Sequence, residues 1–127
     1  LTWVRVPRPR ARQGWGFAEV ARRHGDFAMA GAAAVVELGA GGTVRAVRAG
    51  LMAAGETPLL MSAPGAADAT AGQRWDGQCW DERRWDGLAA AWTAELDFSE
   101  DPEYARALAR VALRRALVDA AARAGAA

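Results

Sequence analysis

The first part of the chain carries apolar residues in patterns that are typical of β-strands. Residues 1–6 alternate polar and apolar side chains and stop at Pro7, which predicts a short strand. Residues 14–22 alternate in the same way and predict a second strand. One side of this second strand is expected to carry Trp15, Phe17 and Glu19. Residues 7–13 contain two prolines and no apolar face, so we expect an extended, solvated connection there. Its arginines are either surface charges or contacts to a partner.

The next part of the chain is expected to form a β-hairpin. After a polar break at residues 23–26, residues 27–38 are rich in alanine and valine, and residues 43–53 are compatible with a strand. The glycine-rich residues 39–42 fit the turn that joins the two. A helix over residues 27–36 remains the alternative, because alanine favours helices and a short apolar run has no readable period.

Residues 55–58 are expected to end the sheet, and beyond them the pattern changes to that of helices. Residues 63–72 are predicted to form one short helix. A second helix is indicated by apolar residues at three- and four-residue spacing. These residues are Trp85, Leu88, Ala89, Trp92 and Leu96.

The last predicted helix has the most complete pattern. Asp101 fits the N-cap position and Pro102 the first helical position. One face is expected to carry Tyr104, Leu108, Val111 and Val118, whereas Arg106, Arg110, Arg114 and Arg123 lie largely elsewhere. Strands followed by helices indicate an α+β fold, with a small three- to four-stranded antiparallel sheet and about three helices packed on one face.

Composition and charge narrow the classes of protein that fit. With 127 residues, of which 52 % are hydrophobic, the chain is long enough for one core, so we expect a single domain over residues 1–127. A formal net charge of +1 argues against a nucleic-acid partner. The longest apolar run, residues 27–36, is too short to cross a bilayer, which argues against a membrane partner and favours a cytoplasmic location. All 16 basic residues are arginine, which suggests a GC-rich bacterial gene, and the start at Leu1 suggests a fragment of a longer protein.

Residue types with catalytic or metal-binding chemistry are sparse. Cys79 is the one cysteine, so neither a disulfide nor an iron–sulfur cluster is expected within the chain. His24 is the one histidine and fits a polar turn better than a catalytic triad or metal site. The glycines of residues 39–42 lack the spacing of a phosphate loop. We therefore predict no catalytic residue and no metal site.

Tryptophan is unusually frequent between residues 75 and 92. The positions are Trp75, Trp80, Trp85 and Trp92. Packing between helices and sheet is one interpretation, and an aromatic surface that docks on another chain is the other. Asp follows three of these tryptophans at five-residue steps, which is far too short for propeller blades.

Several motifs together resemble the C-terminal domain of carbon monoxide dehydrogenase flavoproteins. Residues 2–7 and 14–28 follow the family's opening, which runs strand, proline, glycine–aromatic, basic pair and Gly-Asp-aromatic-Ala. The similarity continues through residues 32–38, 55–58 and 104–117, and so covers nearly the whole chain.

The resemblance implies the C-terminal domain of the FAD-binding medium subunit of a molybdenum hydroxylase of the carbon monoxide/xanthine dehydrogenase family. Such a domain would help to position FAD for electron transfer from iron–sulfur clusters to an acceptor. The implied partners are an iron–sulfur small subunit and a molybdopterin large subunit. Most FAD contacts in this family come from a preceding domain, so the chain alone is not expected to bind FAD, and it is not expected to be catalytic by itself.

The resemblance also points to individual residues. The family's aromatic residue near the isoalloxazine ring corresponds to Phe27, with Asp26 beside it. A phenylalanine packs on or shields the ring but forms no hydrogen bond to it, and plain core packing is its alternative role. Related flavoproteins place a lysine near FAD at the position of Ala18 or Glu19, and this chain has no lysine. The cofactor hypothesis requires the turn at residues 25–27 to lie at the open edge of the sheet, and its rival is an assembly domain of the same fold that does not contact flavin.

Overall fold

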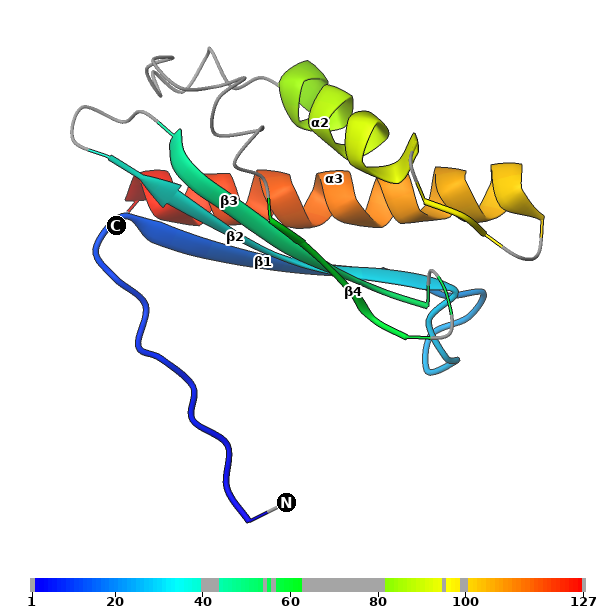
Figure 1. The fold of residues 1–127 in the computed structure, drawn as a ribbon, viewed down its shortest axis with the longest axis horizontal. Coiled ribbons are helices and arrows are strands. Elements are labelled where there is room, and N and C mark those ends of the chain that lie inside the picture. The colour runs from blue at the N-terminus through cyan, green and yellow to red at the C-terminus, as the bar shows by residue number, and fades with distance from the viewer. Residues whose placement is uncertain are drawn as a thin grey trace.

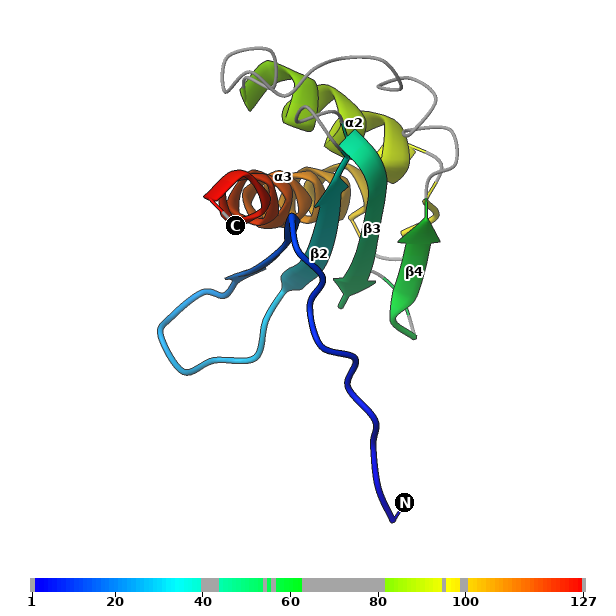
Figure 2. The same cartoon turned by 90° about the vertical axis from the view of Figure 1, so that its left-hand side faces the viewer.

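The computed structural model describes residues 2–39, 44–53, 55, 57–62, 82–94, 96–98 and 101–126. Four strands form one antiparallel sheet in the order β1-β2-β3-β4. They are β1 (Gln13–Val20), β2 (Ala30–Leu38), β3 (Val44–Met52) and β4 (Leu59–Ser62). Two helices, α2 (Glu82–Ala94) and α3 (Pro102–Ala126), lie on the same side of this sheet (Figures 1 and 2).

The α+β class and the four-stranded antiparallel sheet are confirmed. The expected number of helices is wrong for the described residues, which hold two helices where about three were predicted. The helix predicted at residues 63–72 lies outside the described residues. The strand predicted at residues 14–22 is confirmed as β1, with Trp15, Phe17 and Glu19 exposed on one side.

The two antiparallel strands of the predicted hairpin are also confirmed, and the helical alternative for residues 27–36 is wrong. Residues 40–42 of the predicted turn lie outside the described residues. β2 buries every second residue, because one of its faces packs against the helices while the other does not. The buried residues of this face are Ala30, Ala32, Ala34, Val36 and Leu38. β2 and β3 pair along their lengths, with a register shift between Glu37 and Leu38.

Two predictions about the ends of the sheet are wrong. The strand predicted at residues 1–6 is not formed by its described part, residues 2–6. These residues belong to an exposed segment without regular structure, residues 2–10, which we call the arm. The arm leaves on the side of the sheet opposite the helices (Figure 1), where none of the described strands pairs with it. Residues 55–58 do not end the sheet, because β4 follows directly and pairs with β3. Pro58 stands just before this edge strand, where its missing N–H interrupts no ladder.

The face of α3 that meets the sheet differs from the predicted one. Tyr104 is exposed, and Leu108, Val111 and Val118 are only partly buried. The buried face is rich in alanine instead and consists of Ala109, Ala112, Leu113, Ala116, Leu117, Ala120, Ala121 and Ala124.

Two glycines of β1 explain why the buried face of α3 is rich in alanine. A β-carbon added at Gly14 would lie 1.9 Å from the carbonyl oxygen of Ala120, and one added at Gly16 would lie 2.0 Å from that of Ala116. The helix backbone therefore rests directly on the strand, and only small side chains fit beside the contact.

Helix α2 packs on α3 through the predicted stripe. Trp85 and Ala89 are buried, while Leu88, Trp92 and Leu96 pack partly buried against the core. The helix ends at Ala94, so Leu96 continues the stripe from the segment that follows. Trp85 thus belongs to the core, whereas Trp75 and Trp80 lie outside the described residues.

Hydrogen bonds from Arg106 of α3 join this helix to the end of α2, and a separate backbone hydrogen bond lies at the start of α3. Arg106 donates from Nε to the carbonyl oxygen of Thr93 at 3.2 Å and from Nη2 to that of Leu96 at 3.1 Å. These bonds satisfy carbonyl groups that the end of α2 leaves without an intrahelical partner. At the start of α3, the amide of Ala105 donates to the carbonyl of Asp101 at 2.9 Å, as expected for an N-cap position followed by Pro102.

Candidate functional site

The loop between β1 and β2, residues 21–29, holds the predicted flavin-contact motif. Its two ends are joined by the amide of Met29, which donates to the carbonyl of Val20 at 2.8 Å. Inside the loop, the amide of Asp26 donates to the carbonyl of Arg23 at 3.2 Å and forms a tight turn. Gly25 has a φ of 91°, a left-handed conformation that a side chain would strain. The loop is thus a closed turn at the exposed end of β1.

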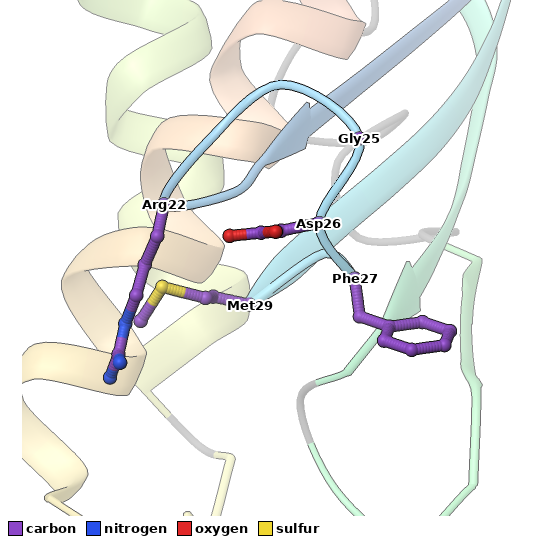
Figure 3. Close-up of a pocket in the computed structure, with 5 residues that line it drawn as sticks. All are labelled: Arg22, Gly25, Asp26, Phe27 and Met29. Atoms are coloured by element: carbon purple, nitrogen blue, oxygen red, sulfur yellow. The ribbon is translucent and has the colours of Figure 1, made fainter.

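A cavity of about 390 Å³ opens at this loop and is lined by Arg22, Gly25, Asp26, Phe27 and Met29 (Figure 3). The carboxylate of Asp26 points to the side on which Arg22 and Met29 lie, whereas the ring of Phe27 points the other way (Figure 3). The Phe27 side chain is 98 % exposed and so does not pack in the core of this chain. The loop therefore offers a free aromatic face beside a cavity with one guanidinium, one carboxylate and one thioether.

The four residues predicted from the family motif do not all come together. Asp26 and Phe27 line the same cavity, but Ala18 and Glu19 are absent from its lining. Ala18 and Glu19 are neighbours on β1 and face opposite sides of the sheet, with Ala18 partly buried against the core and Glu19 exposed.

Sequence reasoning did not single out Arg22 and Met29. Arg22 is the first member of the basic pair in the family motif, which was the available signal. Met29 reaches the cavity only because its backbone closes the loop onto Val20. The local sequence pattern around Met29 therefore does not predict that it lines the cavity.

The described ranges also bear on metal and membrane chemistry. Within them, no three or more His, Cys, Asp or Glu side chains cluster closely enough to hold a metal ion. No helix in this part of the chain is long and apolar enough to cross a bilayer.

Comparison with protein families decides the relationship. The family model of the carbon monoxide dehydrogenase flavoprotein C-terminal domain matches residues 15–120, from β1 to near the end of α3. The chain belongs to this family. The resemblance inferred from the sequence motifs is therefore confirmed, and the matched segment includes the whole β1–β2 loop.

Several solved structures are similar to this chain in sequence and fold. Carbon monoxide dehydrogenase from Hydrogenophaga pseudoflava contains a chain that is 32 % identical, with a TM-score of 0.73, over 93 % of this chain and 40 % of that chain. Carbon monoxide dehydrogenase from Oligotropha carboxidovorans matches at 30 % identity and a TM-score of 0.68, with the same two coverages of 93 % and 40 %. Quinoline 2-oxidoreductase from Pseudomonas putida 86 matches at 30 % identity and a TM-score of 0.71, over 88 % of this chain and 38 % of that chain.

A further relative is caffeine dehydrogenase subunit beta from Pseudomonas sp. (strain CBB1). It is 44 % identical over 66 residues, which are 50 % of this chain and 21 % of that protein. The chain thus spans about two fifths of the solved chains, and the matched half of it spans about one fifth of this subunit. The region similar to this chain is therefore one part of a longer polypeptide in each of these relatives.

Proposed function

We propose that this chain is the C-terminal domain of the FAD subunit of a molybdenum hydroxylase, and that its β1–β2 loop forms one wall of the flavin site. Membership of the family supports the first part of the proposal. The observation that carries the second part is the free ring of Phe27, which stands beside an open cavity. An aromatic ring left in water gains most from packing against another planar, apolar group.

The residues of the loop fit an isoalloxazine group. A β-carbon at Gly25 would meet nothing within 4 Å, so a planar group has room to approach the backbone there. Arg22 supplies a cation, and Met29 an adaptable apolar contact. The cavity of about 390 Å³ lies within the range of roughly 300–1,000 Å³ that is usual for small-molecule sites. The other walls of the site would come from the remainder of the subunit.

When bound, FAD supplies the redox chemistry that passes electrons from iron–sulfur clusters to an acceptor. The residues of this chain would hold and shield it. Phe27 would pack against the ring and keep water from it, while Asp26, whose amide donates a hydrogen bond to the carbonyl of Arg23, fixes the turn that presents Phe27. Glu19 remains a proposed contact through its exposed side chain. Ala18 is partly buried, so any contact that it makes is small.

The relatives support a proposal for the assembly. Subunits of molybdenum hydroxylases act together, so we propose an iron–sulfur small subunit and a molybdopterin large subunit as partners, in the cytoplasm. The rival proposal is an assembly domain that keeps the fold without contacting flavin. The exposed Trp15 and Phe17 on the sheet favour a role of this domain in binding another polypeptide segment.

The decisive experiment compares Phe27→Ala with Tyr104→Ala in the complete subunit. Both residues are exposed aromatics, but Tyr104 lies on α3 and does not line the cavity. An aromatic stack is worth about 0.5–1.5 kcal/mol, so Phe27→Ala should weaken FAD binding roughly 2- to 12-fold and alter the flavin absorbance spectrum. Tyr104→Ala should leave both unchanged.

Two outcomes would contradict the proposal at different levels. Unchanged FAD affinity and spectrum in Phe27→Ala would remove the loop from the flavin site. A complete subunit that purifies without FAD and takes up none would favour the assembly domain instead. The isolated chain is expected to bind FAD weakly or not at all, which equilibrium dialysis measures.

A further inference from the structure

Exposed large hydrophobic side chains gather on one side of the described structure. Six of them lie on the arm or on the face of the sheet turned away from the helices, which we call the outer face. They are Trp3, Val4, Val6, Trp15, Phe17 and Leu60. Among the described residues of the two helices, the one comparable side chain is Tyr104. Scattered exposed apolar residues are normal, but a one-sided group of them marks an interaction surface.

The register of the sheet sets the shape of the outer face. Phe17 pairs with Ala33, which pairs with Gly50, which in turn pairs with Leu60. These positions point to the same side of the sheet, so two small residues separate a phenylalanine ring from a leucine. The row beside it contains Trp15 and Val35. The outer face is therefore a trough with large apolar side chains along its borders.

The arm forms a groove beside this trough, next to the row that contains Trp15 and Val35. A cavity of about 840 Å³ lies between residues 6–10 of the arm and the strands, with Trp15 and Val35 among its lining. Three arginines, Arg8, Arg10 and Arg48, also line it, against a single carboxylate. That carboxylate is Glu37, whose Oε1 lies 3.6 Å from Nη1 of Arg45. The groove thus combines an apolar floor with an excess of positive charge at its border.

Trp15 is held in place at this surface. The guanidinium of Arg123 lies 4.3 Å from the centroid of the Trp15 ring, and its Nη1 donates to the Trp15 carbonyl at 2.6 Å. Nη2 of Arg123 also forms an ion pair with Asp119, whose Oδ2 lies 3.6 Å away. A large side chain that is ordered before binding loses little entropy when a partner covers it, which is the property of an interface anchor.

We propose that the outer face and the arm form the surface on which the remainder of the same subunit docks, through an apolar segment flanked by carboxylates. The solved relatives are longer chains, of which this chain spans about two fifths, so each has further polypeptide to place. The arm projects on the outer side (Figures 1 and 2), so polypeptide joined to it meets this face first. The carboxylates of the partner segment complement the three arginines. The inference rests on the proposed place of this domain in a longer flavin subunit, but not on contact between Phe27 and flavin.

Hydroxyl-radical footprinting tests the docking directly. It would compare the 127-residue chain with the complete subunit, both with FAD and after FAD removal. Trp15, Phe17 and Leu60 should react at least about threefold more slowly in the complete subunit, because the partner segment covers them. Tyr104 is the matched control: it is 51 % exposed, as is Phe17, and its reactivity should stay the same. Equal reactivity of Trp15 and Phe17 in chain and subunit would overturn the proposal.

The same measurement separates this inference from the flavin proposal. Protection of the outer face should persist in the FAD-free subunit, even if Phe27→Ala leaves the flavin spectrum unchanged. Sedimentation of the isolated chain adds a further check. If the isolated chain dimerises and its Trp15 is already protected, the occupant is a second copy and the proposal is wrong.

Paired substitutions give an independent test. Phe17→Glu should lower the Tm of the complete subunit by several degrees but leave that of the isolated chain nearly unchanged, because there the side chain already meets water. Tyr104→Glu is the matched substitution and should have no larger effect in the subunit than in the chain. Similar Tm shifts from Phe17→Glu in chain and subunit would contradict docking at this face.

Discussion

Replacing Gly16 with alanine probes the direct seat of α3 on β1. The new β-carbon would lie 2.0 Å from the carbonyl oxygen of Ala116 and 2.8 Å from the backbone nitrogen of Ala120. Both neighbours are backbone atoms of a helix, so no side-chain rotation relieves the clash. To reach an ordinary contact distance of 3.4 Å, the strand and the helix must separate by about 1.4 Å at this point.

The cost follows from the separation. A gap of roughly 0.5–1 Å already loses a quarter to a half of the dispersion energy between packed atoms, and the alanine-rich face of α3 has no long side chains to refill it. Overpacking in cores costs about 1–3 kcal/mol, and here we expect about 3 kcal/mol because the contact is between backbones. For a domain of this size, that loss lowers the Tm by roughly 10 °C.

Thermal and urea unfolding of the chain, followed by far-ultraviolet circular dichroism, would measure the effect. Gly50→Ala is the matched control, because its β-carbon would meet only the carbonyl oxygen of Leu59 at 3.8 Å. We expect this control to be neutral or slightly stabilising, since glycine loses the most conformational freedom on folding. A Gly16→Ala variant that unfolds within about 2 °C of the unmodified chain would refute the close seat of the helix.

Three further predictions concern α2 and its packing. Trp85→Ala should cost about 3–5 kcal/mol in urea unfolding, because Trp85 is 1 % exposed, whereas Trp3→Ala on the arm should change stability by no more than about 0.5 kcal/mol. Gly87→Ala should raise stability by about 0.5–1 kcal/mol, since its β-carbon would meet nothing within 4 Å in a helix; a lower Tm would contradict this. The hydrogen bond from Arg110 lowers the pKa of Asp86 below its ordinary value of 3.8, so the stabilisation is present above this pH and is lost as the pH falls through the folded-state pKa. Asp86→Asn should therefore make Tm depend less on pH in this acid range, and parallel acid limbs in the two proteins would exclude the effect.

Local patterns predicted the elements whose cause is local. β1 and β2 alternate because each has one face against the helices, and α3 begins at Pro102 because Asp101 and Pro102 suit the first turn. The stripe of α2 was readable because Trp85 and Ala89 lie one turn apart and share a face.

The failures have long-range causes. The buried face of α3 is selected by Gly14 and Gly16, about a hundred positions earlier in the chain. Some large residues of the helix, such as Tyr104, do not lie on this face. The alternating residues 2–6 pair with none of the four described strands, because alternation specifies two faces but not a neighbouring strand. Pro58 resembles a sheet terminator and instead precedes an edge strand.

The candidate site shows the same division. An apolar Phe27 next to a strand fits a core position as well as an exposed one, and only the family motif favoured the second. The structure supplies its 98 % exposure and adds Arg22 and Met29, which the closed loop brings to the same cavity. Ala18 and Glu19 were chosen by position in a motif, which carries no information about the side of the sheet that each one faces.

The contact between β1 and α3 has a consequence for how the domain is made on the ribosome. Among the described elements of this domain, β1 comes first in the sequence and α3 last, and the hydrogen bond from Arg123 to Trp15 spans 108 positions. The four strands pair with their sequence neighbours and are free to form early. The side of β1 that carries Gly14 and Gly16 stays uncovered until α3 leaves the exit tunnel. A nascent chain halted before residue 116 would therefore expose the underside of its sheet, and it is at this stage that a chaperone would find the most to bind.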